Sequence, residues 1–378
     1  MKIGLYIHLP YCRSKCPYCD FNSYPLKEKD DLKHYLKALY EEINIYADQL
    51  KNVVLKSIYF GGGTPTLLSG VSIFNLLDTC IRRFKTEKFM EVTIEANPGT
   101  IDRKKLKILH EAGVNRLSLG GQSLNNHLLK KIGRIHSAED VIDITFNARA
   151  SGFKNINMDI MYALPGQTLE ELQVTLRKTI DLKPEHISLY GLTLSPGTQF
   201  YIDNQNNLLD LPSEDTEFNM FEWSIDYLKK QGYEHYEISN FALEGKRSVH
   251  NQIYWKNQQY LGVGAGAFSY IRGYRYSNTK NPTDYIKRLS CGDLPREAGE
   301  KLSLKKKMAE TVILWLRTRD GVNISNFYQR FKIDVHQPFG TQINKLKDMR
   351  LLEGNKSFFR LSKKGIFLAN QVFEAFII

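Results

Sequence analysis

The sequence has little that would place the protein in a membrane or in an oxidising compartment. It contains no apolar run that approaches the length of a membrane-spanning helix. The first residues are typical of a strand that leads directly into a group of cysteines, so we expect no secretory signal. We therefore expect a cytoplasmic protein, in which the five cysteines are not expected to form a disulfide framework.

The sequence also lacks internal repeats, low-complexity segments and the signatures of zinc fingers or RNA-recognition domains. Its 52 basic and 41 acidic side chains give a net charge of +11, which permits contact with nucleic acid, anionic lipid or an acidic small molecule. The longest basic runs, 103–105 and 305–307, are short and fall in helical stretches. A solvated lysine-rich surface explains this charge more simply. We expect no nucleic-acid partner, and leave the oligomeric state and peripheral membrane contact open.

Short apolar strands alternate with amphipathic helices through the first half of the chain. Between the strands, apolar residues recur every three or four positions, for example over 32–46 and 169–180. Six successive strand–helix units predict a parallel sheet with helical crossovers, which either a partial barrel or a flat doubly wound sheet would satisfy. The predicted strands are 3–8, 55–60, 91–96, 114–119, 155–161 and 186–192.

The positions of chemically suggestive residues favour the barrel. The cysteines follow the first predicted strand, and "GGGTPT" (61–66) follows the second. Glu95 ends the third, "GGQS" (120–123) follows the fourth, and Asp159 lies near the end of the fifth. Barrel enzymes build their sites at the C-terminal face of the strands. We therefore predict an α/β fold with a partial (β/α)6 barrel.

The pattern changes after about residue 200. A stretch rich in aromatic residues and glycine (250–270) precedes a short helix and linker (281–297). The chain becomes helical again from 302, and "LLEGNKSFFRLS" (351–362) predicts a hairpin before a last helix capped by Ser362. These elements predict a small α+β, winged-helix-like module. The predicted division is a core (1–235), a connecting segment (236–300) and a C-terminal module (301–378).

Three of the cysteines, Cys12, Cys16 and Cys19, have the spacing C-x3-C-x2-C. A structural zinc site would need a fourth Cys or His nearby, and neither His8 nor His34 has a paired-motif spacing. A cubane iron–sulfur cluster has four irons, so three thiolates would leave one iron open. An open metal position is what a catalytic site keeps for its substrate.

This spacing after a first barrel strand resembles the radical S-adenosylmethionine (SAM) superfamily. The resemblance implies that Cys12, Cys16 and Cys19 hold a [4Fe–4S] cluster and that the amino and carboxylate groups of SAM bind its fourth iron. A zinc loop is the alternative.

The same resemblance implies a SAM pocket. Its glycine motif corresponds to "FGGGTPT", although a tight turn would explain these glycines about as well. A carboxylate at the core-facing end of a strand is costly unless it is paired, and an arginine could pair with a carboxylate. Taken singly, each polar residue has a structural explanation. The positions that match the SAM site are Tyr6, Tyr18, Gly62, Gly63, Thr64, Glu95, Gln122, Arg134 and Asp159.

A narrower resemblance covers essentially the whole chain. The stretches "YIHLPYC", "YFGGGTPT", "TIEANPGT", "LSLGGQS", "NMDIMYALPGQT" and "LTLSPGTQFY" resemble the group that contains oxygen-independent coproporphyrinogen III dehydrogenase and the heme chaperones. Gly121 stands where this group usually has Val, and Ala163 where it usually has Gly. Both are small residues at loop positions.

Three features favour the heme-chaperone branch of this group. The dehydrogenases carry an additional cysteine where this chain has Phe21, and a long segment before the cluster, whereas only eleven residues precede Cys12 here. The stretch "HNQIYW" (250–255) matches an H-N-x-x-Y-W motif associated with heme binding in the chaperones. His is a common axial ligand of heme iron, so His250 is the candidate ligand. The alternative is a histidine that ends a strand and is hydrogen-bonded to backbone.

The resemblance thus implies a protein that binds heme and transfers it to acceptor proteins, with a [4Fe–4S] cluster and SAM. The alternative is an enzyme that decarboxylates porphyrinogen propionates by radical chemistry. The sequence leaves open which proteins accept the heme, whether SAM is cleaved, and whether heme is held covalently.

Overall fold

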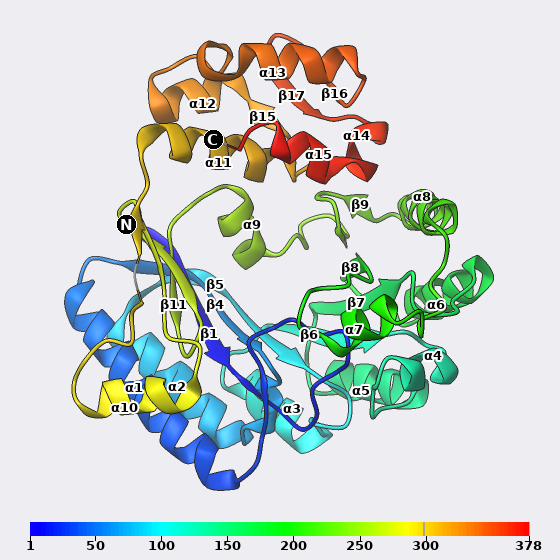
Figure 1. The fold of residues 1–378 in the computed structure, drawn as a ribbon. Helices are drawn as coiled ribbons and strands as arrows, with labels where there is room; N and C mark the ends of the chain where they lie inside the picture. Colours follow the sequence, from blue (N-terminus) through cyan, green and yellow to red (C-terminus); the bar gives the residue numbers. More distant parts are fainter. Residues whose placement is uncertain (298, 378) are drawn as a thin grey trace.

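The computed structural model describes residues 1–297 and 299–377. An α/β part lies below a C-terminal α+β module in the view of Figure 1. The strands are β1 (Lys2–Leu9), β2 (Tyr11–Cys12), β3 (Tyr24–Pro25), β4 (Val54–Gly62), β5 (Lys85–Ala96), β6 (Arg116–Gln122), β7 (Ile156–Tyr162), β8 (His186–Gly191), β9 (Glu234–His235), β10 (Asn240–Ala242), β11 (Tyr260–Val263), β12 (Phe268–Ile271), β13 (Tyr274–Ser277), β14 (Glu300–Lys301), β15 (Val322–Asn323), β16 (Leu352–Gly354) and β17 (Phe358–Leu361).

Local capping residues mark the start of several helices. Ser69 caps one helix, and Thr168 forms a capping box with Glu171 at the start of another. The helices are α1 (Lys29–Gln49), the short 3₁₀ helix η1 (Pro65–Leu67), α2 (Gly70–Arg83), α3 (Arg103–Glu111), α4 (Asn126–Lys131), α5 (Ala138–Ala150), α6 (Leu169–Asp181), α7 (Gln199–Gln205), α8 (Glu214–Lys230), α9 (Val249–Trp255), α10 (Pro282–Ser290), α11 (Leu304–Leu316), α12 (Ile324–Phe331), α13 (His336–Asp348), α14 (Lys363–Phe367) and α15 (Ala369–Glu374).

The predicted strands correspond to β1, β4, β5, β6, β7 and β8, which lie side by side in chain order and pair in parallel. Helices connect them, as the alternation of the sequence predicts. The prediction of an α/β fold with a partial barrel of six parallel strands is confirmed.

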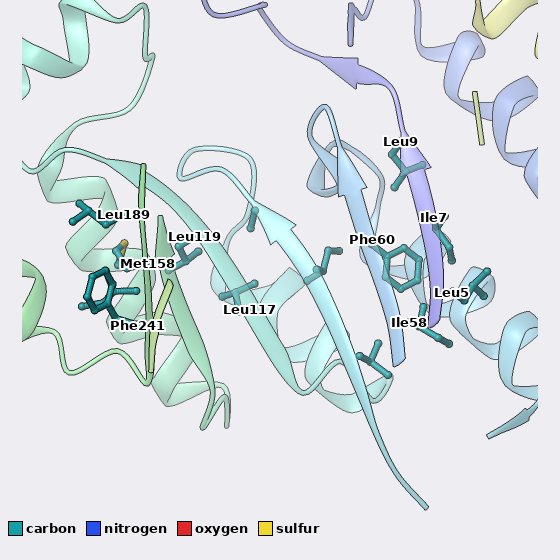
Figure 2. Packing of buried hydrophobic residues seen from close by; sticks show 14 of the residues in the cluster. Leu5, Ile7, Leu9, Ile58, Phe60, Leu117, Leu119, Met158, Leu189 and Phe241 are labelled. Atoms are coloured by element: carbon teal, nitrogen blue, oxygen red, sulfur yellow. The ribbon is translucent and has the colours of Figure 1, made fainter. Parts of the chain in front are cut away.

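Alternation along each strand separates the core from the site. Figure 2 shows buried side chains at every second position, such as Leu5 and Ile7 of β1 and Ile58 and Phe60 of β4. Successive side chains of a strand point to opposite faces of the sheet. The residues between them, such as Tyr6, therefore point to the other face, where the polar candidate residues gather.

The sheet extends beyond the predicted strands at both ends. Within the described residues its order is β14-β13-β12-β11-β1-β4-β5-β6-β7-β8-β10-β9. β11 pairs in parallel with β1, and β10 pairs antiparallel with β8. The segment 236–300, expected to connect two domains, thus supplies strands to the main sheet. The domain boundary at 235 stays a prediction.

The C-terminal module has the predicted α+β composition. Helices α11, α12 and α13 accompany a small antiparallel sheet of order β15-β17-β16, and this succession of elements is typical of a winged helix. The predicted hairpin is the β16–β17 pair. The single last helix expected after Ser362 is interrupted at Leu368, where φ is −108° and ψ is 27°, values outside the helical range.

Charged side chains join the module to the end of α9. Arg317 Nε donates to Glu237 Oε2 at 3.1 Å, and its guanidinium lies 4.5 Å from the centre of the Trp255 ring. Arg330 Nη1 donates to the backbone oxygen of Lys256 at 3.0 Å. The last residues of α9 are therefore held against the module. In the part of the chain that the structure describes, no helix is long and apolar enough to cross a membrane.

Candidate functional site

A cavity of about 540 Å³, here called the main cavity, lies at the C-terminal ends of the parallel strands. The loop that carries the cysteines forms one of its walls. The predicted site residues in its lining are Cys12, Cys16, Tyr18, Cys19, Gly62, Gly63, Thr64, Glu95, Gln122, Arg134 and Asp159. The fold thus brings most of the candidate residues together, although they come from separate strand–helix units.

The cysteine loop packs closely on the glycines after β4. A Cβ atom added at Gly63 would lie 2.6 Å from the backbone oxygen of Tyr11 and 3.0 Å from Cys12 Sγ, so only glycine fits there. Thr64 Oγ1 donates to Cys12 Sγ at 3.5 Å. Burial raises the pKa of the Cys12 thiol, and the bond from Thr64 opposes that shift. Burial also raises the pKa of Cys19.

Arg134, in the loop after α4, contacts the cysteine loop. Its Nη2 donates to Asn97 Oδ1 at 2.6 Å and to the backbone oxygen of Gly120 at 3.0 Å, and its Nη1 lies 3.6 Å from Cys16 Sγ. Its Nε is buried without a hydrogen-bond partner among the described residues. Burial lowers the pKa of Arg134, but the neighbouring Tyr18 and Cys16 raise it by more, so the pKa lies above its ordinary value. A charged donor in this wall favours an anionic group in the cavity.

Two carboxyl groups face the same cavity. Glu95 accepts from Tyr59 OH at 2.8 Å and from the backbone N–H of Gly62 at 3.1 Å. Burial raises its pKa to about 7, and the nearby charge of Asp159 acts in the same direction. Asp159 accepts from Ser118 Oγ at 3.1 Å and from Asn157 Nδ2 at 2.8 Å, and burial raises its pKa as well. Such oxygens suit ammonium or hydroxyl groups of a ligand.

Sequence reasoning missed Asn97. Its Nδ2 donates to Thr64 Oγ1 at 3.0 Å while its Oδ1 accepts from Arg134, so it links the glycine turn to the arginine. Asn97 follows Glu95 by two positions, and strand alternation places such residues on one face. That spacing was the available signal.

Tyr6 and His250 lie outside this arrangement, since the described lining of the main cavity includes neither. Tyr6 stacks on Tyr59, with ring centres 6.0 Å apart, and its OH lies 3.0 Å from His8 Nδ1. Its role in holding a cofactor stays a prediction.

His250 lies in α9 and is 1% exposed. Its Nδ1 is 2.8 Å from Ser57 Oγ and its Nε2 is 2.9 Å from Tyr254 OH. Burial lowers its pKa to about 3. The alternative of a strand-ending histidine bonded to backbone is wrong, because the residue is helical and both ring partners are hydroxyls. Iron ligation by His250 stays a prediction, and it would require one of these hydroxyls to move.

Comparison with known proteins agrees with this geometry. Residues 6–179 match the model of the radical SAM superfamily, and residues 302–368 match the HemN C-terminal domain. A heme chaperone HemW from Lactococcus lactis is 39% identical over 99% of this chain and 97% of its own. A HemW from Bacillus subtilis is 38% identical over 98% of each chain. The chain belongs to the HemW family of radical SAM proteins.

A solved structure supports the fold. Coproporphyrinogen III oxidase (HemN) from Escherichia coli, a radical SAM enzyme, superposes with a TM-score of 0.88 at 24% identity. The match covers 99% of this chain and 90% of that one. This likeness confirms the predicted architecture, including the C-terminal module.

Membership of the radical SAM superfamily implies a [4Fe–4S] cluster and SAM, and the residues of the main cavity fit both. All three thiols of the motif line one cavity, and thiolates are the usual ligands of such clusters. Across residues 1–297 and 299–377, no three Cys, His, Asp or Glu side chains form a site for a single metal ion, so the fit rests on the shared cavity. The partnerless Nε of Arg134 and the carboxyls of Glu95 and Asp159 provide polar groups for a zwitterionic ligand.

Proposed function

We propose that this protein is a cytoplasmic heme chaperone, which binds heme and passes it to acceptor proteins. The observation that carries the proposal is identity of 38–39% to proteins named heme chaperones, spread over 98% or more of this chain. Phe21 adds to it, because the dehydrogenases to which the sequence is otherwise similar have a further cysteine at this position. The identity of the acceptor proteins is open.

In this proposal the cysteine loop holds the cluster through Cys12, Cys16 and Cys19. The glycine turn, Thr64 and the polar groups of Glu95, Arg134 and Asp159 hold SAM. When bound, the cluster and SAM supply one-electron chemistry. The protein's own part is positional, because the hydrogen bonds from Arg134 to Asn97 and from Asn97 to Thr64 fix the wall behind Cys12.

Glu95 is a group in this cavity that can exchange a proton near neutral pH. Its pKa of about 7 leaves the carboxyl partly protonated there, while Tyr59 and Gly62 hold its two oxygens in place. Binding of a cationic group beside it would favour the carboxylate and release that proton.

Anaerobic reconstitution with iron and sulfide, followed by parallel assays with heme and with coproporphyrinogen, tests the proposal. Each assay contains SAM. We expect heme binding by the reconstituted protein and no decarboxylation of coproporphyrinogen. Decarboxylation without heme binding would overturn the proposal and identify a porphyrin-pathway enzyme instead.

A further inference from the structure

A second cavity, of about 660 Å³, adjoins the main cavity. The two share part of the cysteine loop, including Lys15 and Phe21, and also Gly62 and Glu95. The rest of the second cavity comes from segments far apart in the chain. Its lining includes Tyr6 of β1, Tyr254 of α9, Tyr260 of β11 and Phe268 of β12.

Aromatic rings dominate the walls of the second cavity. Phe21 is 60% exposed and Phe268 is 54% exposed, and both line it. Deeper in the wall, the rings of Tyr254 and Tyr260 meet edge to face with their centres 4.5 Å apart. Large aromatic side chains left in contact with water beside a cavity are typical of a site for an apolar ligand.

Lysines provide the charge complement to these rings. Lys15 Nζ donates to the backbone oxygens of Phe21 at 3.2 Å and Ser23 at 3.3 Å, which fixes the ammonium at the cavity wall. Lys280 is exposed, and its backbone oxygen accepts from Asn22 Nδ2 at 3.0 Å. Asp20 and Glu95 are the acidic side chains among the described residues that both cavities share. The cavity thus combines flat apolar walls with cations that can meet carboxylates.

The aromatic wall also indicates what His250 does. His250 is not among the described residues that line either cavity, whereas Tyr254 lines the second cavity. The His250 ring lies 5.0 Å from that of Tyr59, and its Nε2 is hydrogen-bonded to Tyr254 OH. His250 therefore lies behind the lining of the second cavity, bonded to Tyr254 and with its ring centre 6.3 Å from that of Tyr6.

We propose that the second cavity is the site of the metalloporphyrin. Phe21, Phe268 and the two tyrosines pack on the macrocycle, and Lys15 and Lys280 pair with its propionates. His250 is a positioning residue that holds Tyr254. The inference rests on the proposed function, since it says where the heme of a heme chaperone lies. The main cavity suits heme less well, because Asp159, which the described lining of the second cavity does not include, would add a further carboxyl facing its propionates.

Heme titration of the reconstituted full-length protein, followed by Soret absorbance, tests the site. The Phe21→Ala/Phe268→Ala variant is compared with Phe146→Ala, which removes a similar ring that is 62% exposed on α5. We expect the double variant to weaken heme binding at least tenfold and the control to stay within twofold of wild type. The absorbance of the cluster verifies that each variant is folded.

Heme dimethyl ester, which lacks free carboxylates, tests the role of the lysines. We expect Lys280→Ala to weaken binding of heme two- to threefold and to leave binding of the diester unchanged. An equal effect on both ligands would contradict the assigned ion pairing.

The outcomes separate this inference from the function on which it rests. If wild type binds heme and the double phenylalanine variant binds it equally well, the site assignment is wrong while the chaperone function stands. If wild type with an intact cluster binds no heme, the proposed function itself fails.

Tyr254→Phe and His250→Gln test the positioning role. Tyr254→Phe removes the hydroxyl of this hydrogen bond and His250→Gln removes its imidazole, so we expect similar, few-fold losses of affinity and an unchanged Soret maximum. A shifted Soret band in His250→Gln, with none in Tyr254→Phe, would instead make His250 the iron ligand and overturn its positioning role.

Discussion

The two adjoining cavities differ in how the chain builds them. The main cavity is lined by thiols, glycines and carboxyls that follow successive parallel strands. Each short sequence motif therefore contributes its own part of the lining. The second cavity is lined by aromatic rings from β1, α9 and β12 and by lysines from two loops, which lie far apart in the sequence. A site made from strand ends leaves a local pattern in the sequence, and a site made from the joining of distant segments does not.

Of the changes considered, loss of a single motif thiol is expected to have the largest effect, and that effect is on the main cavity. Cys12→Ala, Cys16→Ala and Cys19→Ala should each abolish the iron–sulfur absorbance after reconstitution, because all three thiols face the main cavity. Cys291→Ala is the matched control, since that thiol is exposed. Iron content and absorbance at wild-type level in any of the first three would show that the motif does not hold the cluster.

Glu42→Gln, in α1, is expected to change the pH dependence of stability by removing a buried carboxyl. Glu42 is 0% exposed and accepts from Tyr285 OH at 2.6 Å and from the backbone N–H of Gly264 at 2.7 Å. Burial raises its pKa to about 7. In the unfolded chain the pKa of this carboxyl has its ordinary value of 4.5, so the folded state gains stability from the protonated form below that pH. This stability is lost as the pH rises towards 7.

The size of this effect follows from the shift in pKa, and is roughly 3 kcal/mol in the free energy of unfolding. Urea unfolding of wild type and Glu42→Gln between pH 4.5 and 7 measures it. We expect the free energy of unfolding of the variant to rise relative to that of wild type as the pH increases over this range. Glu111→Gln, at an exposed position, is the control, and a constant difference for Glu42→Gln would contradict the prediction.

Asp159→Asn is expected to affect the main cavity alone. The substitution keeps the size of the side chain and removes its charge, so SAM affinity should fall about tenfold, which corresponds to about 1.4 kcal/mol. Heme affinity should stay within twofold of wild type, because the described lining of the second cavity does not include Asp159. Equilibrium dialysis with SAM and a Soret titration measure the two values. Equal losses for both ligands would mean that the cavities form one site.

Of the changes considered, an increase in salt concentration is expected to have the smallest effect on heme binding. Raising sodium chloride from about 0.05 M to about 0.5 M should weaken heme binding by about twofold, because exposed lysine–carboxylate pairs are screened. Binding of the dimethyl ester should not weaken. A Soret titration of wild type at both salt concentrations measures this, and a loss for the ester as large as that for heme would exclude screening of the propionates as the cause.

Most of the core and main cavity could be predicted from the sequence because their signals are local. The apolar alternation of 55–60 and the motif of Cys12, Cys16 and Cys19 need no distant partner to be recognised. The strands at the edge of the sheet can be recognised only from their pairing with distant partners. β11 joins the parallel strands through its pairing with β1, in which Gly4 lies opposite Tyr260. The loop after β11 is held by another distant residue, since Asn22 Nδ2 donates to the backbone oxygen of Ala265 at 3.0 Å.

Helix α9 shows why the surroundings of His250 could not be predicted. Besides the cap from Ser248, its first N–H groups, those of Val249 and His250, donate to the carboxylate of Glu91 in β5, at 3.0 and 2.9 Å. This second cap comes from a residue more than 150 positions away. The motif was visible in the sequence, but the direction of each of its side chains depends on that distant carboxylate.

The shortness of α9 has a consequence for how the chain tolerates change. In barely two turns, Asn251 faces the main cavity, Tyr254 faces the second cavity, and Trp255 lies beneath Arg317 of the C-terminal module. One inserted residue would rotate everything after it by about 100° around the helix axis. Insertions in surface loops generally cost little stability, but in α9 a single-residue insertion or deletion would break the contacts with three parts of the molecule at once.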